Sequence, residues 1–166
     1  MRNIVLTGFM GTGKTTVGQI VATQTGLAFV DTDAVIVARA EQSIAEIFAA
    51  QGEPAFRALE AEVCADLAAG GGQVIATGGG ALLDPRTVEV FADGNLFVCL
   101  MCDLDEIARR IGDDPLRPLA RDGIERLARL LESRRPIYAR VPHQIDTSSL
   151  TPQQAAEEII RLWQHT

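Results

Sequence analysis

Long hydrophobic runs are missing from this sequence of 166 residues. The longest purely apolar stretch is seven residues, 96–102, whereas a membrane-spanning helix needs about 20. The chain also passes from Met1 and Arg2 into a short apolar run at 4–6, with no apolar stretch of signal-peptide length. These absences exclude a helical membrane protein and lead us to expect a cytoplasmic one.

Cysteine is scarce: the sequence has three, Cys64, Cys99 and Cys102. An odd number in a chain expected inside the cell argues against a disulfide-stabilised fold. The Cys99-x-x-Cys102 spacing occurs in redox and zinc sites. However, residues three apart on a strand point to opposite faces, and the sequence has no second pair. We therefore interpret these thiols as buried and unreactive.

Basic residues are also few, 15 against 22 acidic ones, for a net charge of −7. Such a chain is poorly suited to bind nucleic acid or an anionic membrane surface. Residues 109–140 differ, with nine arginines and five acidic residues. This block is either a solvated helix face or part of a site for an anionic ligand, and on its own favours the former.

Only one basic residue is a lysine, Lys14. A preference for arginine can reflect genomic base composition and by itself indicates no function. It does not explain why a lysine is retained at this one position.

The length predicts a single domain over residues 1–166. Apolar runs predict strands at 4–6, 27–30, 74–76, 96–100 and 143–146, with helical patterns between them. This alternation predicts an α/β fold, with a mostly parallel sheet covered by helices on both faces. Segment 112–123 lacks both patterns, and long loops of this kind often act as lids.

Several motifs predict helix ends. Gly26 would close the first helix, and Pro54 suits the first turn of a later one. Helix starts are predicted at Ser43-x-x-Glu46, Asp84-Pro85, Asp103-x-x-Glu106 and Thr151-Pro152.

The clearest motif is a glycine-rich loop between the first strand and the first helix. It reads Gly8-Phe9-Met10-Gly11-Thr12-Gly13-Lys14-Thr15 and fits G-x-x-x-x-G-K-[ST]. Its glycines let backbone amides surround a phosphate, and the helix N-terminus adds its positive dipole end. The lysine of such a loop reaches the β- and γ-phosphates, and the last hydroxyl reaches Mg²⁺. A chance glycine-rich turn is the weaker alternative.

Two acidic residues, Asp31 and Asp33, follow the second predicted strand. Ligands of parallel sheets bind at the carboxyl ends of strands, so both would face the crevice beside the loop. One carboxylate can hold the water ligands of a metal ion, and the other can accept a substrate proton. Alternatively, Asp33 only caps a helix over 34–40. The neighbouring loop favours the functional interpretation.

Arg57 and Glu60 lie three residues apart on a predicted helix and can form an ion pair. Such a pair is usually a weak surface contact. Beside a cleft, however, a paired arginine can present its planar fork to a carboxylate or phosphate. The helix itself leaves both interpretations open.

Three glycines, Gly78, Gly79 and Gly80, follow the third predicted strand. Ordered glycines lower stability, so they are typical of places where a ligand approaches the backbone closely. A plain flexible turn is the alternative, and we interpret the second triplet, 70–72, as one.

Two arginines of the basic block are further candidates. Arg117 lies in the 112–123 loop, from which an arginine can close over a nucleotide and stabilise a transferring phosphoryl group. Arg134 lies near the end of a helical pattern, where arginines can also simply stabilise the last carbonyls.

Together these motifs resemble the shikimate kinase family. The shared features run in the family's order from Gly8 to the Arg-x-Pro-Ile-Tyr segment ending at Tyr138, so they cover nearly the whole chain. The resemblance implies a nucleoside-monophosphate-kinase-like P-loop fold with three α-β-α layers and a five-stranded parallel sheet. It also implies a substrate-binding helical region at about 33–61 and a mobile lid at about 112–123.

For the nucleotide, the resemblance implies that Arg110 stacks near adenine and Arg117 lies over the phosphates. Mg²⁺ would be held by Thr15 and, through water, by Asp31. The ATP phosphates would be held by Gly11, Thr12, Gly13, Lys14, Thr15 and Thr16.

For the acceptor, the resemblance implies that Asp33 binds shikimate hydroxyls and accepts the proton of the attacking 3-hydroxyl. Arg57 and Arg134 would bind the substrate carboxylate, and Glu60 would orient the arginines. Backbone groups of Gly78, Gly79 and Gly80 would complete this site. The catalytic group would be Asp33, Lys14 and Arg117.

The implied activity is Mg²⁺-dependent transfer of the γ-phosphoryl group of ATP to the 3-hydroxyl of shikimate, in the chorismate pathway to aromatic amino acids. Two alternatives are another small-molecule kinase of this fold, acting on gluconate or a nucleotide, and a non-catalytic nucleotide-binding regulator. We expect a monomer without nucleic-acid or membrane partners. One departure is segment 146–152, which lacks the basic residue that some members carry near adenine.

Overall fold

Four of the five strands are short apolar runs, the fifth is the mostly polar segment 143–146, and together they form a parallel sheet. The computed structural model describes residues 2–112 and 123–165. Within these ranges, five strands pair in the order β2-β3-β1-β4-β5, and every neighbouring pair is parallel. The predicted α/β fold is confirmed. The strands are β1 (Ile4–Gly8), β2 (Ala28–Asp31), β3 (Gln73–Ala76), β4 (Leu96–Met101) and β5 (His143–Asp146).

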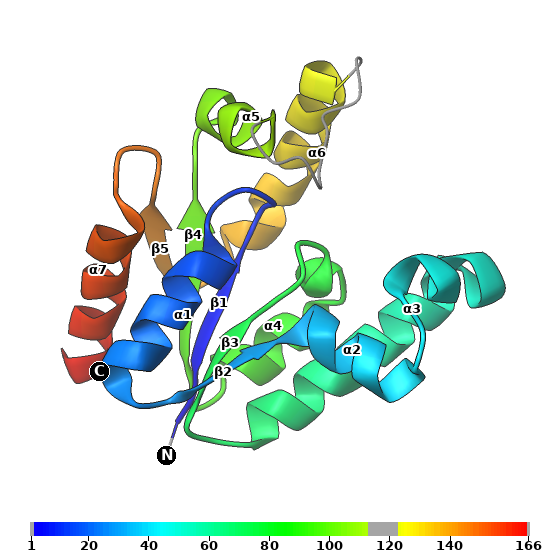
Figure 1. Cartoon of the computed structure of the whole chain (residues 1–166), viewed down its shortest axis with the longest axis horizontal. Coiled ribbons are helices and arrows are strands. Elements are labelled where there is room, and N and C mark those ends of the chain that lie inside the picture. Colours follow the sequence, from blue (N-terminus) through cyan, green and yellow to red (C-terminus); the bar gives the residue numbers. More distant parts are fainter. Residues whose placement is uncertain (1, 113–122, 166) are drawn as a thin grey trace.

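Helices cover both faces of the sheet (Figure 1). They are α1 (Lys14–Thr25), α2 (Thr32–Ala40), α3 (Ile44–Ala69), α4 (Pro85–Ala92), α5 (Leu104–Gly112), α6 (Gly123–Tyr138) and α7 (Pro152–His165), with a 3-10 helix η1 (Ala81–Leu83). Side chains alternate across β1, so Ile4 and Leu6 pack with α1 and α7, whereas Val5 packs with α3 and α4. The sheet and the helices on its two faces form the three expected α-β-α layers. No helix in the described ranges is long and apolar enough to cross a membrane.

Most helix ends agree with the sequence motifs. α1 is closed by Gly26, whose φ of 73° is left-handed. Ser43 and Glu46 form both hydrogen bonds of the capping box at the start of α3. Pro54 follows a kink at Gly52, where φ is 79°. The break at Gly52 divides α3 into two helical segments, with Pro54 in the first turn of the second, as expected.

The start of α5 differs from a capping box. The helix begins after Asp103 as predicted, but the Glu106 carboxylate accepts hydrogen bonds from Arg109 and Arg110. The Asp103 amide donates instead to the Ser148 hydroxyl, 2.8 Å away. Arginines three and four residues along a helix compete for the same carboxylate, and here they hold it.

The side chain of Asn3 joins three segments at the amino end of the sheet. It is completely buried, and its Nδ2 donates to the carbonyls of Leu67, at 3.1 Å, and Gly70, at 3.3 Å. Its Oδ1 accepts from the Gln73 amide at 3.1 Å. These bonds fix the end of α3 and the turn 70–72 against β1. That turn therefore lies away from the edge where the functional motifs gather.

We expect Asn3→Ala to lower the free energy of unfolding by about 2–4 kcal/mol, because it leaves buried backbone groups without partners. Urea unfolding of the purified protein measures this. The control Gln153→Ala removes an exposed hydrogen bond to Glu157 and should change stability by less than about 0.5 kcal/mol. Equal effects of the two substitutions would show that the Asn3 bonds are unimportant.

Candidate active site

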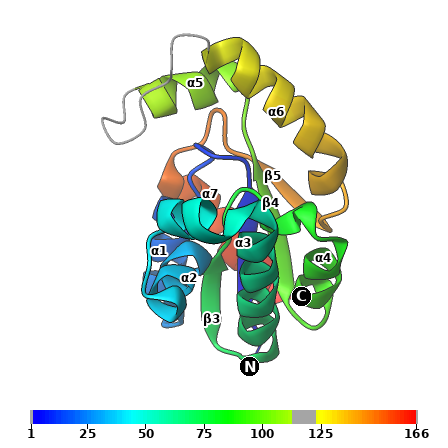
Figure 2. The same cartoon turned by 90° about the vertical axis from the view of Figure 1, so that its right-hand side faces the viewer.

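The carboxyl ends of the strands meet at one edge of the sheet, and the predicted site residues gather there. The glycine-rich loop follows β1, Asp31 ends β2, Gly78 lies just after β3, and Thr147 follows β5. Helices α5 and α6 lie above this edge (Figure 2). The sheet thus brings together residues that are far apart in the sequence.

The glycine-rich loop leads directly into α1. Gly13 occupies the N-cap position with a left-handed φ of 96°, and no side chain caps the helix. The first amides of α1 are therefore suited to bind an anion. Lys14 Nζ donates to the carbonyls of Gly8 and Phe9, at 2.8 Å each. Thr12 is buried, and its hydroxyl donates to the Phe9 carbonyl at 2.8 Å.

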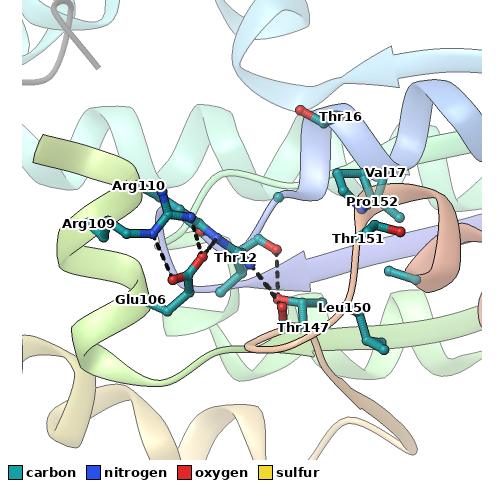
Figure 3. Close-up of a pocket in the computed structure, with 13 residues that line it drawn as sticks. Thr12, Thr16, Val17, Glu106, Arg109, Arg110, Thr147, Leu150, Thr151 and Pro152 are labelled. Carbon is teal, nitrogen blue, oxygen red and sulfur yellow. Dashed lines mark hydrogen bonds and ion pairs between the residues drawn. The ribbon is translucent and has the colours of Figure 1, made fainter. Parts of the chain in front are cut away.

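A cavity of about 450 Å³ lies between this loop, α5 and the start of α7 (Figure 3). Its polar lining comes from the loop and from Glu106, Arg109 and Arg110, and its apolar lining from Leu150 and Pro152. The remaining lining residues are Gly11, Thr12, Gly13, Thr16, Val17, Thr147, Thr151 and Ala155.

Arg110 is held in this cavity wall by three partners. Its Nε donates to Glu106 at 2.8 Å, Nη1 to the Gly11 carbonyl at 3.2 Å, and Nη2 to the Thr147 carbonyl at 2.9 Å. Hydrogen bonds from Arg109 and Arg110 lower the pKa of Glu106 to about 2. The carboxylate therefore stays ionised at working pH. Arg110 thus lies beside the glycine-rich loop in a fixed orientation, and its expected stacking near adenine stays a prediction.

Thr147 is a site residue that the sequence reasoning missed. It is 2% exposed, and its hydroxyl lies 3.1 Å from the Thr12 carbonyl and 3.0 Å from the Met101 carbonyl. Its own amide also donates to Met101. Segment 146–152, which lacks a basic residue, thus binds the glycine-rich loop through the hydroxyl of Thr147. Thr147 directly follows a strand, and the same kind of position marked Asp31 as a candidate in the sequence.

Asp31 and Asp33 have different local roles. The Oδ1 of Asp31 accepts from the amides of Asp33, at 2.9 Å, and Ala34, at 3.4 Å, and so caps α2. The alternative in which Asp33 is the cap is therefore wrong. Asp33 lies in the first turn of α2, with its Oδ1 facing Gly78.

Arg57 and Glu60 form a partly buried pair, in which the Arg57 side chain is 26% exposed. Arg57 Nη1 lies 2.6 Å from Glu60 Oε2, and the Glu60 side chain is only 4% exposed. Burial raises the pKa of Glu60 despite this contact, and the charge of Asp33 raises it further, whereas Arg134 lowers it. The structure thus gathers Arg57, Glu60 and Asp33, and the charge of Arg134 also acts on Glu60. Arg57 Nε is buried without a hydrogen-bond partner in the described part of the chain.

The three glycines after β3 leave space for this cluster. A Cβ on Gly78 would lie 2.7 Å from Asp33 Oδ1, and one on Gly80 would lie 2.5 and 2.6 Å from the two terminal nitrogens of Arg57. A Cβ on Gly79 would meet only the Met10 amide, at 3.9 Å. Charged side chains therefore approach Gly78 and Gly80 closely, which a plain flexible turn would not need, whereas Gly79 has space.

Two other expectations concern Arg117 and the cysteines. Arg117 and most of the expected lid fall within 113–122, outside the described residues. Cys64, Cys99 and Cys102 are buried free thiols, and burial raises the pKa of Cys99 to about 12. The prediction that these thiols are buried is confirmed, and the raised pKa is consistent with low reactivity. Across 2–112 and 123–165, no three His, Cys, Asp or Glu side chains are grouped to hold a metal ion.

Comparison with known proteins shows which family has this sequence and fold. Residues 10–164 match the sequence profile of a family described as Shikimate kinase. The chain belongs to the shikimate kinase family. It is 44% identical over 160 residues to a shikimate kinase of Geobacter sulfurreducens, covering 95% of this chain and 88% of that one. It is 38% identical over 164 residues to one of Caldicellulosiruptor bescii, covering 98% and 95%.

Solved structures agree with this assignment. A shikimate kinase from Acinetobacter baumannii, in complex with shikimate, has a TM-score of 0.90 at 32% identity, over 99% of this chain and 94% of that one. Family membership makes this chain a kinase and confirms the resemblance and the P-loop fold. A gluconokinase from Sinorhizobium meliloti has a TM-score of 0.61 at 17% identity. That likeness concerns the fold alone and does not support the gluconate alternative.

We expect Gly80→Ala in this kinase to displace the Arg57 guanidinium and leave the buried Glu60 carboxylate poorly paired. The free energy of unfolding should fall by about 1–3 kcal/mol. Gly79→Ala is the matched comparison, because its Cβ has space, and should cost less than about 1 kcal/mol. Urea unfolding of both variants measures the difference. An equal loss in both would contradict the close approach of Arg57 to Gly80.

Proposed function

We propose that the protein transfers the γ-phosphoryl group of ATP to the 3-hydroxyl of shikimate and releases ADP. The product, shikimate 3-phosphate, belongs to the chorismate pathway to aromatic amino acids. The family match over residues 10–164 supports this reaction. Within the structure, the supporting observation is the partly buried Arg57–Glu60 pair beside Asp33, at the sheet edge that also carries the glycine-rich loop.

On the nucleotide side, the phosphates of ATP bind the loop amides and the charge of Lys14. The residues assigned to them are Gly11, Thr12, Gly13, Lys14, Thr15 and Thr16. The base enters the cavity of about 450 Å³, whose wall holds Arg110. Arg117, from the lid at 112–123, covers the phosphates and stabilises charge on the transferred group.

Thr15 and Asp31 suit a magnesium ion. A hydroxyl and a carboxylate are hard oxygen donors, and Mg²⁺ sites in kinases use few protein ligands beside phosphates and water. The Asp31 carboxylate is kept in place by the amides at the start of α2. Thr15 would hold the ion directly and Asp31 through water. When bound, the ion neutralises phosphate charge.

On the acceptor side, the substrate carboxylate binds Arg57 and Arg134, which can each form two parallel hydrogen bonds with it. Glu60 orients Arg57, and backbone groups of Gly78, Gly79 and Gly80 line the site. Asp33 binds the ring hydroxyls and accepts the proton of the 3-hydroxyl as it attacks. Catalysis depends chiefly on positioning and on neutralising charge.

The proposal extends to the organisation of the chain. Residues 1–166 form one domain, with a substrate-binding region at about 33–61. The protein acts as a monomer in the cytoplasm without a nucleic-acid or membrane partner. A net charge of −7 supports the absence of such partners, because it opposes attraction to phosphate-rich surfaces.

We expect the purified protein to release ADP from ATP only when both shikimate and Mg²⁺ are present. The assay measures ADP with shikimate, gluconate or a nucleoside monophosphate as acceptor, with and without EDTA. Turnover with gluconate or a nucleotide, but not with shikimate, would contradict the proposed acceptor. ATP binding without ADP release under any condition would favour the non-catalytic regulator.

We expect Asp33→Asn to lower kcat by about 10²–10⁴-fold, because the amide cannot accept the proton of the attacking hydroxyl. The dissociation constant of ATP should stay within about twofold of the unmodified protein. Asp66→Asn, which changes an exposed carboxylate paired with Arg39, is the control and should retain kcat. Unchanged catalysis in Asp33→Asn would refute the assigned base.

A further inference from the structure

The hydroxyl of Tyr138 contacts the glycine triplet. Tyr138 is the last residue of α6, is 1% exposed, and is the single tyrosine of the sequence. Its hydroxyl donates to the Gly79 carbonyl at 3.1 Å, across 59 residues of sequence. Burial raises the pKa of Tyr138, so the hydroxyl keeps its proton and remains a donor. None of the roles assigned above uses this contact.

The other backbone contacts of the triplet are local or lie at its first residue. The Gly78 amide donates to the Thr32 hydroxyl at 3.0 Å. The carbonyls of Gly78 and Gly80 accept from the amides of Ala81 and Leu83 in the following η1 turn. The Gly79 carbonyl is thus the point at which α6 holds the middle of the triplet. In both Figure 1 and Figure 2, the C-terminal end of α6 lies close to the segment that follows β3.

The hydrogen bond from Tyr138 constrains the whole peptide group between Gly79 and Gly80. The carbonyl of Gly79 and the amide of Gly80 belong to one planar peptide and point in opposite directions. A peptide between two glycines has wide rotational freedom, because neither residue has a side chain to restrict it. The Tyr138 hydroxyl therefore decides which way this peptide faces. It does so beside the Arg57 guanidinium, which occupies the space next to Gly80.

The same contact also anchors the part of α6 that carries Arg134. Arg134 precedes Tyr138 by four residues, and residues four apart share one face of a helix. Pro136 lies between them and has no amide for the helix ladder, so this last turn has one fewer internal bond. The charge of Arg134 acts on both Tyr138 and Glu60. An anchor at Tyr138 thus limits how far Arg134 can move from the Arg57–Glu60 pair.

We propose that Tyr138 is a positioning residue for the acceptor: its hydroxyl orients the Gly79–Gly80 peptide beside Arg57 and anchors the turn of α6 that carries Arg134. This inference rests on the proposed function, since it concerns the binding of shikimate. Tyr138 touches neither the reacting atoms nor the nucleotide cavity. Its ring lies in the core cluster that includes Cys99 and Leu131, and this packing is separate from the contact that its hydroxyl makes.

Tyr138→Phe tests the hydroxyl alone, because it keeps the ring. We expect the dissociation constant of shikimate, measured by calorimetry without nucleotide, and the KM for shikimate to rise roughly three- to tenfold, the loss of one hydrogen bond. The KM for ATP and kcat should stay within about twofold. Ser133→Ala is the matched control: it removes a hydroxyl bond to Leu130 on the same helix at an exposed position, and its shikimate binding should be unchanged.

The possible outcomes distinguish a failure of the role proposed for Tyr138 from a failure of the proposed shikimate kinase activity. If the unmodified protein binds and phosphorylates shikimate but Tyr138→Phe binds it equally well, the positioning role is wrong and the proposed function stands. A lower melting temperature with equal losses toward both substrates would also overturn the role, because it indicates a structural contribution. If the unmodified protein does not bind shikimate, both proposals fail.

Discussion

The parallel alignment of the strands is the constraint on which the site depends. Because all five strands run the same way, the segments that follow them converge at one edge of the sheet. The glycine-rich loop lies after the central strand β1, between the Arg57–Glu60 pair and the cavity wall that holds Arg110. A nucleotide and an acceptor can therefore approach the same loop from two sides. Transfer between two ligands needs this arrangement, since the reacting groups must meet in line.

The partly buried ion pair shows where stability has been given up for function. Removing the Glu60 carboxylate from water costs free energy, and its attraction to the partly exposed Arg57 offsets only part of that cost. Burial raises the pKa of Glu60, which is the electrostatic sign of that cost. Three ordered glycines beside the pair add a further entropic cost. Neither feature is explained by folding, because an apolar helix face against an alanine-containing turn would be more stable. The proposed binding of a substrate carboxylate to the oriented guanidinium would account for both.

The sequence predicted whatever depends on neighbouring residues. Strand positions, the glycine-rich loop and the Ser43 capping box are set within a few residues, and the structure agrees with them. The order of the strands, and the choice between a surface and a partly buried Arg57–Glu60 pair, depend on distant packing that periodicity does not encode. The helix start predicted at Asp103-x-x-Glu106 is confirmed, although arginines on the same helix hold the Glu106 carboxylate. Thr147 and Tyr138 were missed as site residues because their contacts cross 135 and 59 residues.

Those two hydroxyls point to a common requirement of glycine-rich turns that bind anions. Backbone amides can face a ligand only if the carbonyls of the same peptides are satisfied elsewhere, because the two groups of a peptide point in opposite directions. Here the Gly11 carbonyl accepts from Arg110, the Thr12 carbonyl from Thr147, and the Gly79 carbonyl from Tyr138. Glycine gives these loops freedom to adopt the binding conformation, and side chains from other elements remove that freedom again. The conformation of these loops therefore depends also on residues far from them in the sequence.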